Sequence, residues 1–243
     1  MFAVVRIASI RILAIVLAVL VLAVPLGVVA QQYARANPIC IGIDPGHGGY
    51  DGGVTGLKTG VKECDVNLSV AGYLATYLRG AGYRVVQTRT KDVAPVEVGS
   101  ILADDSVQTG ARKVRDMNLR LATLRNAACD LAISIHCNFY PSGYRRGIQV
   151  FYGKDADLPL AQCLQNDLNA TLNMPQIGRE YQPLWGDLYL PANAHCPTAI
   201  VECGFLSNAE DEALLVQDSY RMILAYQLFC AIQSYLGQDV LNV

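Results

Sequence analysis

The chain has 243 residues, which is enough for one domain with a sizeable core. Two of its 19 basic residues and none of its 21 acidic residues precede residue 31, so the remainder has a net charge of −4. This acidic balance, without a basic stripe, excludes nucleic acid as the expected partner.

The N-terminus carries an apolar run, Ile12–Ala30, that follows Arg6 and Arg11. A positive start before an apolar stretch is typical of an export signal, and the run is also near the minimum length for a membrane-crossing helix. A cleaved signal peptide and a retained membrane anchor are therefore both open. In either case we expect residues 1–36 to be a leader with a short linker, and residues 37–243 to be one domain outside the cytoplasm.

The stretch Ile39–Gly49 is a short apolar run that stops at Asp-Pro and opens into a glycine-rich turn. Apolar runs bounded by Pro and Gly indicate buried strands. His47 would then lie just beyond the carboxyl end of a central strand, where open α/β sheets bind their ligands. The turn lacks the Gly-Lys-Ser/Thr of a phosphate-binding loop, so a phosphate-binding protein is the weakest reading.

Beyond this turn, strands alternate with helices, which predicts an α/β sandwich with a mainly parallel sheet. Asp65 is a suitable N-cap for the first helix. We expect irregular surface segments at 91–111 and Met174–Trp185. The expected strands are Tyr83–Thr88, Leu131–Ile135, Ile148–Tyr152, Leu188–Leu190 and Thr198–Val201, and the expected helices are Asp65–Arg79, Val114–Ala128, Leu158–Leu172, Ala209–Leu215 and Tyr220–Leu236.

Three of the predicted strands end in polar residues, namely His47, His136 and Glu202, and Glu63 stands at a helix start. Two histidines and a carboxylate with one open position describe a catalytic zinc site, and a further carboxylate acts as general base. For each residue a structural role is the competing interpretation. Glu202 is hardest to assign to structure alone, because a carboxylate that ends an apolar strand is costly unless it is paired or lies at a site. We do not expect His195 to be a ligand.

The chain has eight cysteines, and none of them forms a Cys-x-x-Cys pair, which argues against a structural zinc knuckle. Most lie inside apolar runs, where a free cysteine behaves as a small hydrophobic residue. Strand alternation places Cys137 on the face opposite His136, so the two are not expected to share a metal. We expect most of these thiols to be buried, among Cys40, Cys64, Cys129, Cys137, Cys163, Cys196, Cys203 and Cys230.

Four motifs, in order, resemble the signatures of the zinc-dependent N-acetylmuramoyl-L-alanine amidases of the amidase type 3 family. They are Asp44–Gly49, Glu63, Ser134–Asn138 and Val201–Asn208. The resemblance covers about residues 39–236. It implies a three-layer sandwich with a mostly parallel six-stranded sheet flanked by helices.

The resemblance further implies that His47, Glu63 and His136 bind Zn²⁺ and that Glu202 is the catalytic carboxylate. Asn138 would lie near the metal and contact substrate or Glu202. The implied reaction is hydrolysis of the amide between the lactyl group of N-acetylmuramic acid and L-alanine in peptidoglycan. Alternatives are a peptidase acting elsewhere on the stem peptide, and a wall-binding module without catalysis.

The stretches Arg112–Ile135 and Ile148–Gly153 look most like the germination-specific, spore-cortex branch of this family. This implies a role in muramic-δ-lactam formation in the forespore intermembrane space, with a general autolysin or division amidase as the alternative. An activating partner protein is a further open expectation. Leu190–Asn193 departs from the family's usual Leu-Arg, and Arg145 and Arg179 are the candidate substitutes for that arginine.

Overall fold

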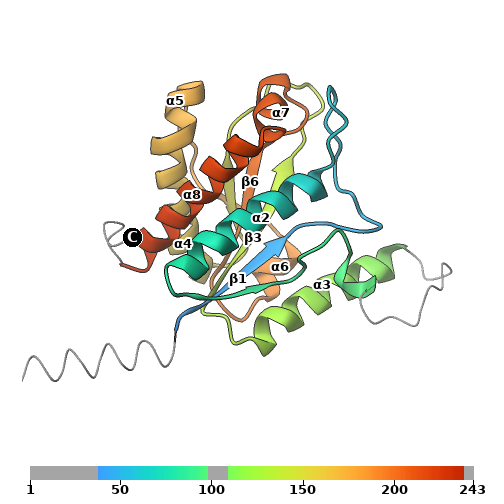
Figure 1. The fold of residues 1–243 in the computed structure, drawn as a ribbon, viewed down its shortest axis with the longest axis vertical. Helices are drawn as coiled ribbons and strands as arrows, with labels where there is room; N and C mark the ends of the chain where they lie inside the picture. The colour runs from blue at the N-terminus through green and yellow to red at the C-terminus, as the bar shows by residue number, and fades with distance from the viewer. Residues whose placement is uncertain (1–37, 98–108, 238–243) are drawn as a thin grey trace, which may run out of the picture. The chain divides into compact units, whose positions relative to one another are not determined.

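A computed structural model describes residues 38–97 and 109–237 (Figure 1). The expected leader and linker, residues 1–36, lie outside this range. From Cys40 on, the described residues form one compact unit. Within the described ranges, no helix combines the length and the apolar character that a membrane crossing requires.

The centre of the molecule is a six-stranded sheet with the strand order β2-β1-β3-β6-β4-β5. All neighbouring strands are parallel except β4 and β6, which are antiparallel. The predicted α/β fold with a mostly parallel six-stranded sheet is therefore confirmed. The strands are β1 (Cys40–Pro45), β2 (Arg84–Gln87), β3 (Leu131–Asn138), β4 (Gln149–Tyr152), β5 (Leu184–Trp185) and β6 (Thr198–Phe205).

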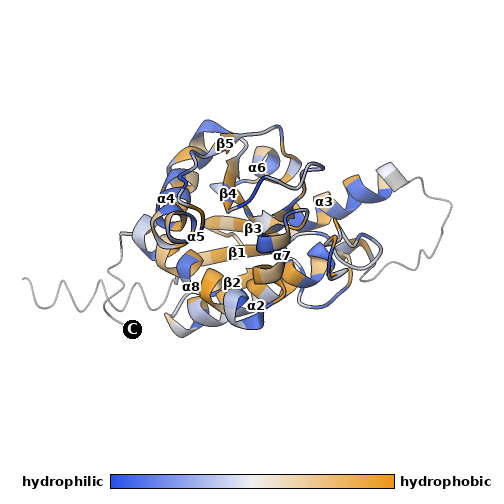
Figure 2. Ribbon diagram, turned by 90° about the horizontal axis from the view of Figure 1, so that it is seen from above, coloured by the Kyte–Doolittle hydropathy of each residue, from blue (hydrophilic) through white to orange (hydrophobic). Residues whose placement is uncertain are grey.

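Helices cover both faces of the sheet, which gives three layers (Figure 2). One face carries α2 (Glu63–Gly80), α4 (Leu158–Leu168) and α8 (Asp218–Tyr235), and α7 (Ala209–Leu215) packs beside β6 and α8. The other face carries α3 (Thr109–Asn126) and α6 (Tyr189–Asn193). The remaining helical elements are short, namely η1 (Pro95–Glu97), η2 (Asp155–Asp157), η3 (Asn169–Asn173) and α5 (Met174–Ile177).

Strand β1 is buried along its whole length, as its apolar sequence predicts. Gly42 in this strand permits close packing, because a Cβ there would overlap the side chain of Leu124 on α3. All eight cysteines are free thiols, and only Cys163 and Cys230 are less than fully buried. The apolar context of the cysteines therefore predicts their burial correctly.

Two predictions on the β4–β6 connection are wrong. Leu188–Leu190 is not a strand, because α6 begins at Tyr189 and places Pro191 in its first turn, where no backbone donor is needed. The segment Met174–Trp185, which was expected to be irregular, contains α5 and the two-residue strand β5. Strand β5 is fixed by its pairing with β4, a tertiary contact that cannot be predicted from a sequence of two residues.

The predicted helix over residues 158–172 also changes character, because a π-helical turn begins at Asn169. This turn aims Asn173 at the start of β4, where its side chain bonds both the N–H and the carbonyl of Ile148, at 2.8 and 2.9 Å. The π-helical turn thus interrupts the regular helix and provides hydrogen-bond partners for buried backbone groups at the start of the strand.

Candidate metal centre

The carboxyl ends of three neighbouring strands meet at one edge of the sheet. His47 follows β1 by two residues, and His136 and Glu202 are paired in register across β3 and β6. Glu63 is the first residue of α2, whose N-terminus points to the same edge. The four residues that the sequence singled out therefore lie together.

The ligating atoms of His47, Glu63 and His136 all lie within 4.8 Å of one another. Glu63 Oε1 is 3.2 Å from His47 Nε2 and 3.0 Å from His136 Nδ1. The two imidazole rings approach edge to face, with centroids 5.0 Å apart. One carboxylate oxygen thus sits between two imidazole nitrogens, each from a different strand end.

Glu63 is buried and held on both oxygens. The backbone N–H of Val54 donates to Oε2 at 2.9 Å, and that of Cys137 donates to Oε1 at 3.0 Å. Burial alone would raise the pKa of Glu63, but the bonds from His136 and His47 outweigh it and hold the pKa well below its usual value. The prediction that Asp65 caps α2 is wrong, because the helix begins two residues earlier so that Glu63 can enter the site.

His47 is oriented by a carboxylate that the sequence analysis missed. Its Nδ1 lies 3.1 Å from Oδ2 of Asp51, which leaves Nε2 facing Glu63. Burial lowers the pKa of His47, but Glu63 and Asp51 together more than compensate and raise it. A carboxylate behind a histidine is the usual device for fixing the tautomer of a metal ligand. The sequence signal that could have identified Asp51 was its position four residues after His47, within the same glycine-rich turn.

Two buried arginines hold the backbone of the turn that carries His47. Arg89 donates to the carbonyl oxygens of Pro45 and Gly46 at 2.8 and 3.0 Å. Arg120 donates to those of Pro45 and His47 at 2.9 and 2.7 Å. His47 itself has a φ of 60°, a left-handed conformation that costs energy for a residue other than glycine. The arginines therefore donate hydrogen bonds to three consecutive backbone carbonyls and stabilise this strained turn.

Gly46 cannot carry a side chain. A Cβ at this position would overlap the ring of His136. The glycine in the turn therefore serves the close approach of the two histidines as well as the turn itself.

Glu202 lines an open hollow together with His47, Glu63 and His136. Its Oε2 is buried and has no hydrogen-bond partner among the described residues. Burial raises the pKa of Glu202 to about 7, with Glu63 adding to the rise and His136 opposing it. A carboxyl group whose pKa lies near neutral pH, and which has one oxygen free of hydrogen bonds to the described residues, is suited to accepting and returning a proton.

Other sequence candidates fall in different places. Asn138 lines the same hollow, and its Oδ1 accepts from the N–H of Phe139 at 2.8 Å. His195 is exposed and does not line this hollow. Arg145 lies over the ring of Tyr140 and Arg179 over that of Tyr181, and neither arginine lines this hollow.

The three donors fit a zinc ion. Two imidazole nitrogens and one carboxylate oxygen are the ligand set of a catalytic site with an open position. The pKa of Glu63 ensures the anionic form that metal binding requires. The unpartnered oxygen of Glu202, beside but not among these donors, leaves a group for chemistry.

Residues 41–234 match the protein family described as N-acetylmuramoyl-L-alanine amidase. The chain is similar to the germination-specific N-acetylmuramoyl-L-alanine amidase of Bacillus subtilis, at 34% identity over 198 residues that cover 81% of this chain and 79% of the relative. It is also similar to the CwlD amidase of Clostridioides difficile, solved in complex with the GerS lipoprotein, at 27% identity and a TM-score of 0.73, covering 83% of this chain and 100% of that one. A second amidase structure, from Clostridium difficile 630, has 26% identity and a TM-score of 0.67, covering 84% of this chain and 99% of that one.

Proposed function

The chain belongs to the family of N-acetylmuramoyl-L-alanine amidases, and from this premise we propose that it hydrolyses peptidoglycan as a zinc enzyme at the centre described above. His47, Glu63 and His136 would hold the ion, and Glu202 would carry the proton. The observation behind this assignment is the convergence of three donor atoms within 4.8 Å, beside a buried carboxylate oxygen without a partner.

The residues of the chain divide the work of amide hydrolysis. A bound zinc ion would supply Lewis acidity, which polarises the scissile carbonyl and makes water more acidic. Glu202 takes a proton from the attacking water on its free oxygen and returns it to the nitrogen of L-alanine, which then leaves as an amine. Asp51 keeps His47 in one tautomer throughout, and the N–H groups of Val54 and Cys137 keep Glu63 in place.

Mass spectrometry of peptidoglycan fragments tests this proposal directly. The zinc-loaded full chain should release peptides that start at L-alanine and leave peptide-free muramic acid. Cleavage within the stem peptide would replace the amidase by a peptidase. An absence of products with zinc bound would favour a wall-binding module, or an enzyme that needs an activating partner.

The finer role we propose is maturation of spore cortex, in the forespore intermembrane space. It is supported by the 34% identity to the germination-specific amidase. In this role, removal of the stem peptide precedes muramic-δ-lactam formation. The chain should therefore restore muramic-δ-lactam to the cortex of Bacillus subtilis that lacks its own germination-specific amidase, and a lactam-free cortex would contradict the role.

We also propose an activating lipoprotein partner. The support is that the CwlD amidase was solved in complex with the GerS lipoprotein. The N-terminal apolar segment would keep the enzyme near such a partner if it remains uncleaved. Turnover of the purified chain that is already maximal without any added protein would contradict this requirement.

A further inference from the structure

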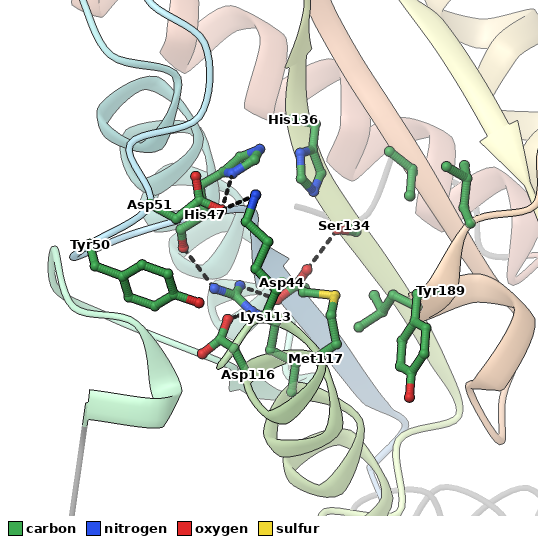
Figure 3. Close-up of a pocket in the computed structure, with 14 residues that line it drawn as sticks. Asp44, His47, Tyr50, Asp51, Lys113, Asp116, Met117, Ser134, His136 and Tyr189 are labelled. Atoms are coloured by element: carbon green, nitrogen blue, oxygen red, sulfur yellow. Dashed lines mark hydrogen bonds and ion pairs between the residues drawn. The ribbon is translucent and has the colours of Figure 1, made fainter. Parts of the chain in front are cut away.

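A second hollow adjoins the metal centre (Figure 3). The two hollows share four lining residues, His47, Asp51, Lys113 and His136. The second hollow has a volume of about 260 Å³ and extends away from Glu202, between α3 and α6. Its apolar walls come from Met117, Leu188, Leu190 and Ile200.

Lys113 on α3 lies at the junction of the two hollows. Figure 3 shows its amine beside Asp51, facing the gap between the two histidines. The Nζ atom is 3.7 Å from Asp51 Oδ2, and 59% of the side chain is exposed. One long ion pair leaves most of the hydrogen-bonding capacity of an ammonium group unused.

The other guanidinium or ammonium group that lines these hollows in the described structure is Arg120, and it is already committed. It donates to the carboxylates of Asp44 and Asp116 at 2.8 Å each, and to two backbone carbonyls. Its side chain is almost completely buried. Lys113 is therefore the lining cation of the described residues that can turn toward a ligand.

We propose that Lys113 binds a free carboxylate of the stem peptide and that the second hollow receives the peptide half of the substrate. This inference rests on the proposed function. Before cleavage, the lactyl carboxyl of muramic acid is tied up in the amide, so the glycan half offers no carboxylate there. The stem peptide carries a free carboxylate on the residue after L-alanine. The apolar walls suit the alanyl methyl group, and the glycan half is left with the opposite hollow, beside Asn138 and Phe139.

Peptide binding tests the inference without relying on turnover. Two alanyl peptides differ only in their second residue, D-glutamate with a free α-carboxylate or D-isoglutamine with an amide. Calorimetry with the zinc-loaded full chain should show about tenfold tighter binding of the acid, as expected for a charge-assisted bond. Lys113→Met should reduce this preference to less than about twofold, and Lys113→Arg should retain it.

Arg115→Met is the matched control, because Arg115 is exposed on the same helix and lines neither hollow. It removes the same charge and should keep the tenfold preference, which separates a direct contact from a general field effect. A wild-type chain without preference, or a Lys113→Met variant that weakens both peptides equally, would overturn the inference. Discrimination between the peptides in a protein that never releases L-alanine-terminated products would instead count against the proposed function.

Discussion

Glu202 is the residue whose assignment is simplest to test. Glu202→Gln keeps the size and the burial of the side chain but cannot accept a proton, so turnover should fall about 10²- to 10⁴-fold. Zinc should remain bound, because the three ligating groups are unchanged. The measurement pairs a muropeptide release assay with metal analysis of the same sample. Turnover near the wild-type rate would remove Glu202 from the reaction.

Glu202 should also make the stability of the metal-free protein depend on pH. The pKa of Glu202 is about 7 in the fold against 4.5 for an ordinary glutamate, so the native state holds an extra proton between these values. Stability should then fall as pH rises through this window, by roughly 3 kcal/mol in total. Glu202→Gln lacks this loss. Urea unfolding at pH 5 and pH 8 should show the variant gaining on the wild type at the higher pH, and parallel behaviour would contradict the pKa.

At the scale of elements, Arg120 joins α3 to the end of β1. It pairs with Asp44 and Asp116, and the pKa of Asp44 is about 2 because Arg120, Thr88 and Ser134 overcome the effect of burial. Arg120→Met would leave two buried carboxylates without their cation. The expected cost is about 3–5 kcal/mol in the free energy of unfolding.

Urea unfolding measures this cost, and Arg115→Met on the exposed side of α3 is the control, with an expected change within about 0.5 kcal/mol. Equal effects of the two variants would show that Arg120 contributes only as a general charge. In a variant that still folds, zinc affinity should also fall, because the carbonyl of His47 loses its donor.

The sequence was a good guide wherever one strand was apolar and ended sharply. The ends of β1, β3 and β6 predicted where His47, His136 and Glu202 lie, because parallel strands deliver their carboxyl ends to one edge. Asp51 was missed although it lies only four residues after His47, whose Nδ1 it contacts. Arg89 and Arg120 were missed, because each acts through bonds to backbone carbonyls far away in the sequence, which no local pattern encodes. Helix α6 and strand β5 were missed for a similar reason, since they are too short for periodicity and depend on their neighbours.

At the scale of the whole molecule, the fold concentrates cost at one edge of the sheet. A strained His47, a buried Glu63 and a half-buried Glu202, whose buried Oε2 has no partner among the described residues, all lie there, while β1 and its neighbours are packed with apolar side chains. Such an arrangement is expected where a bound ion repays the cost, because an ion that binds only the native state stabilises it by mass action. The stability of the whole domain should then depend on metal.

Zinc at a hundredfold excess over its dissociation constant should add about 2.7 kcal/mol to the free energy of unfolding. For a domain of this size that corresponds to an increase in Tm of roughly 5–10 °C, which thermal unfolding with zinc or with a chelator will measure. His136→Ala should abolish the increase, because the ion loses one of its ligands. His195→Ala should retain it, since His195 is exposed and away from the centre. If His136→Ala responded to zinc as the wild type does, the ion would have to bind elsewhere, and the centre at the strand ends would lose its metal.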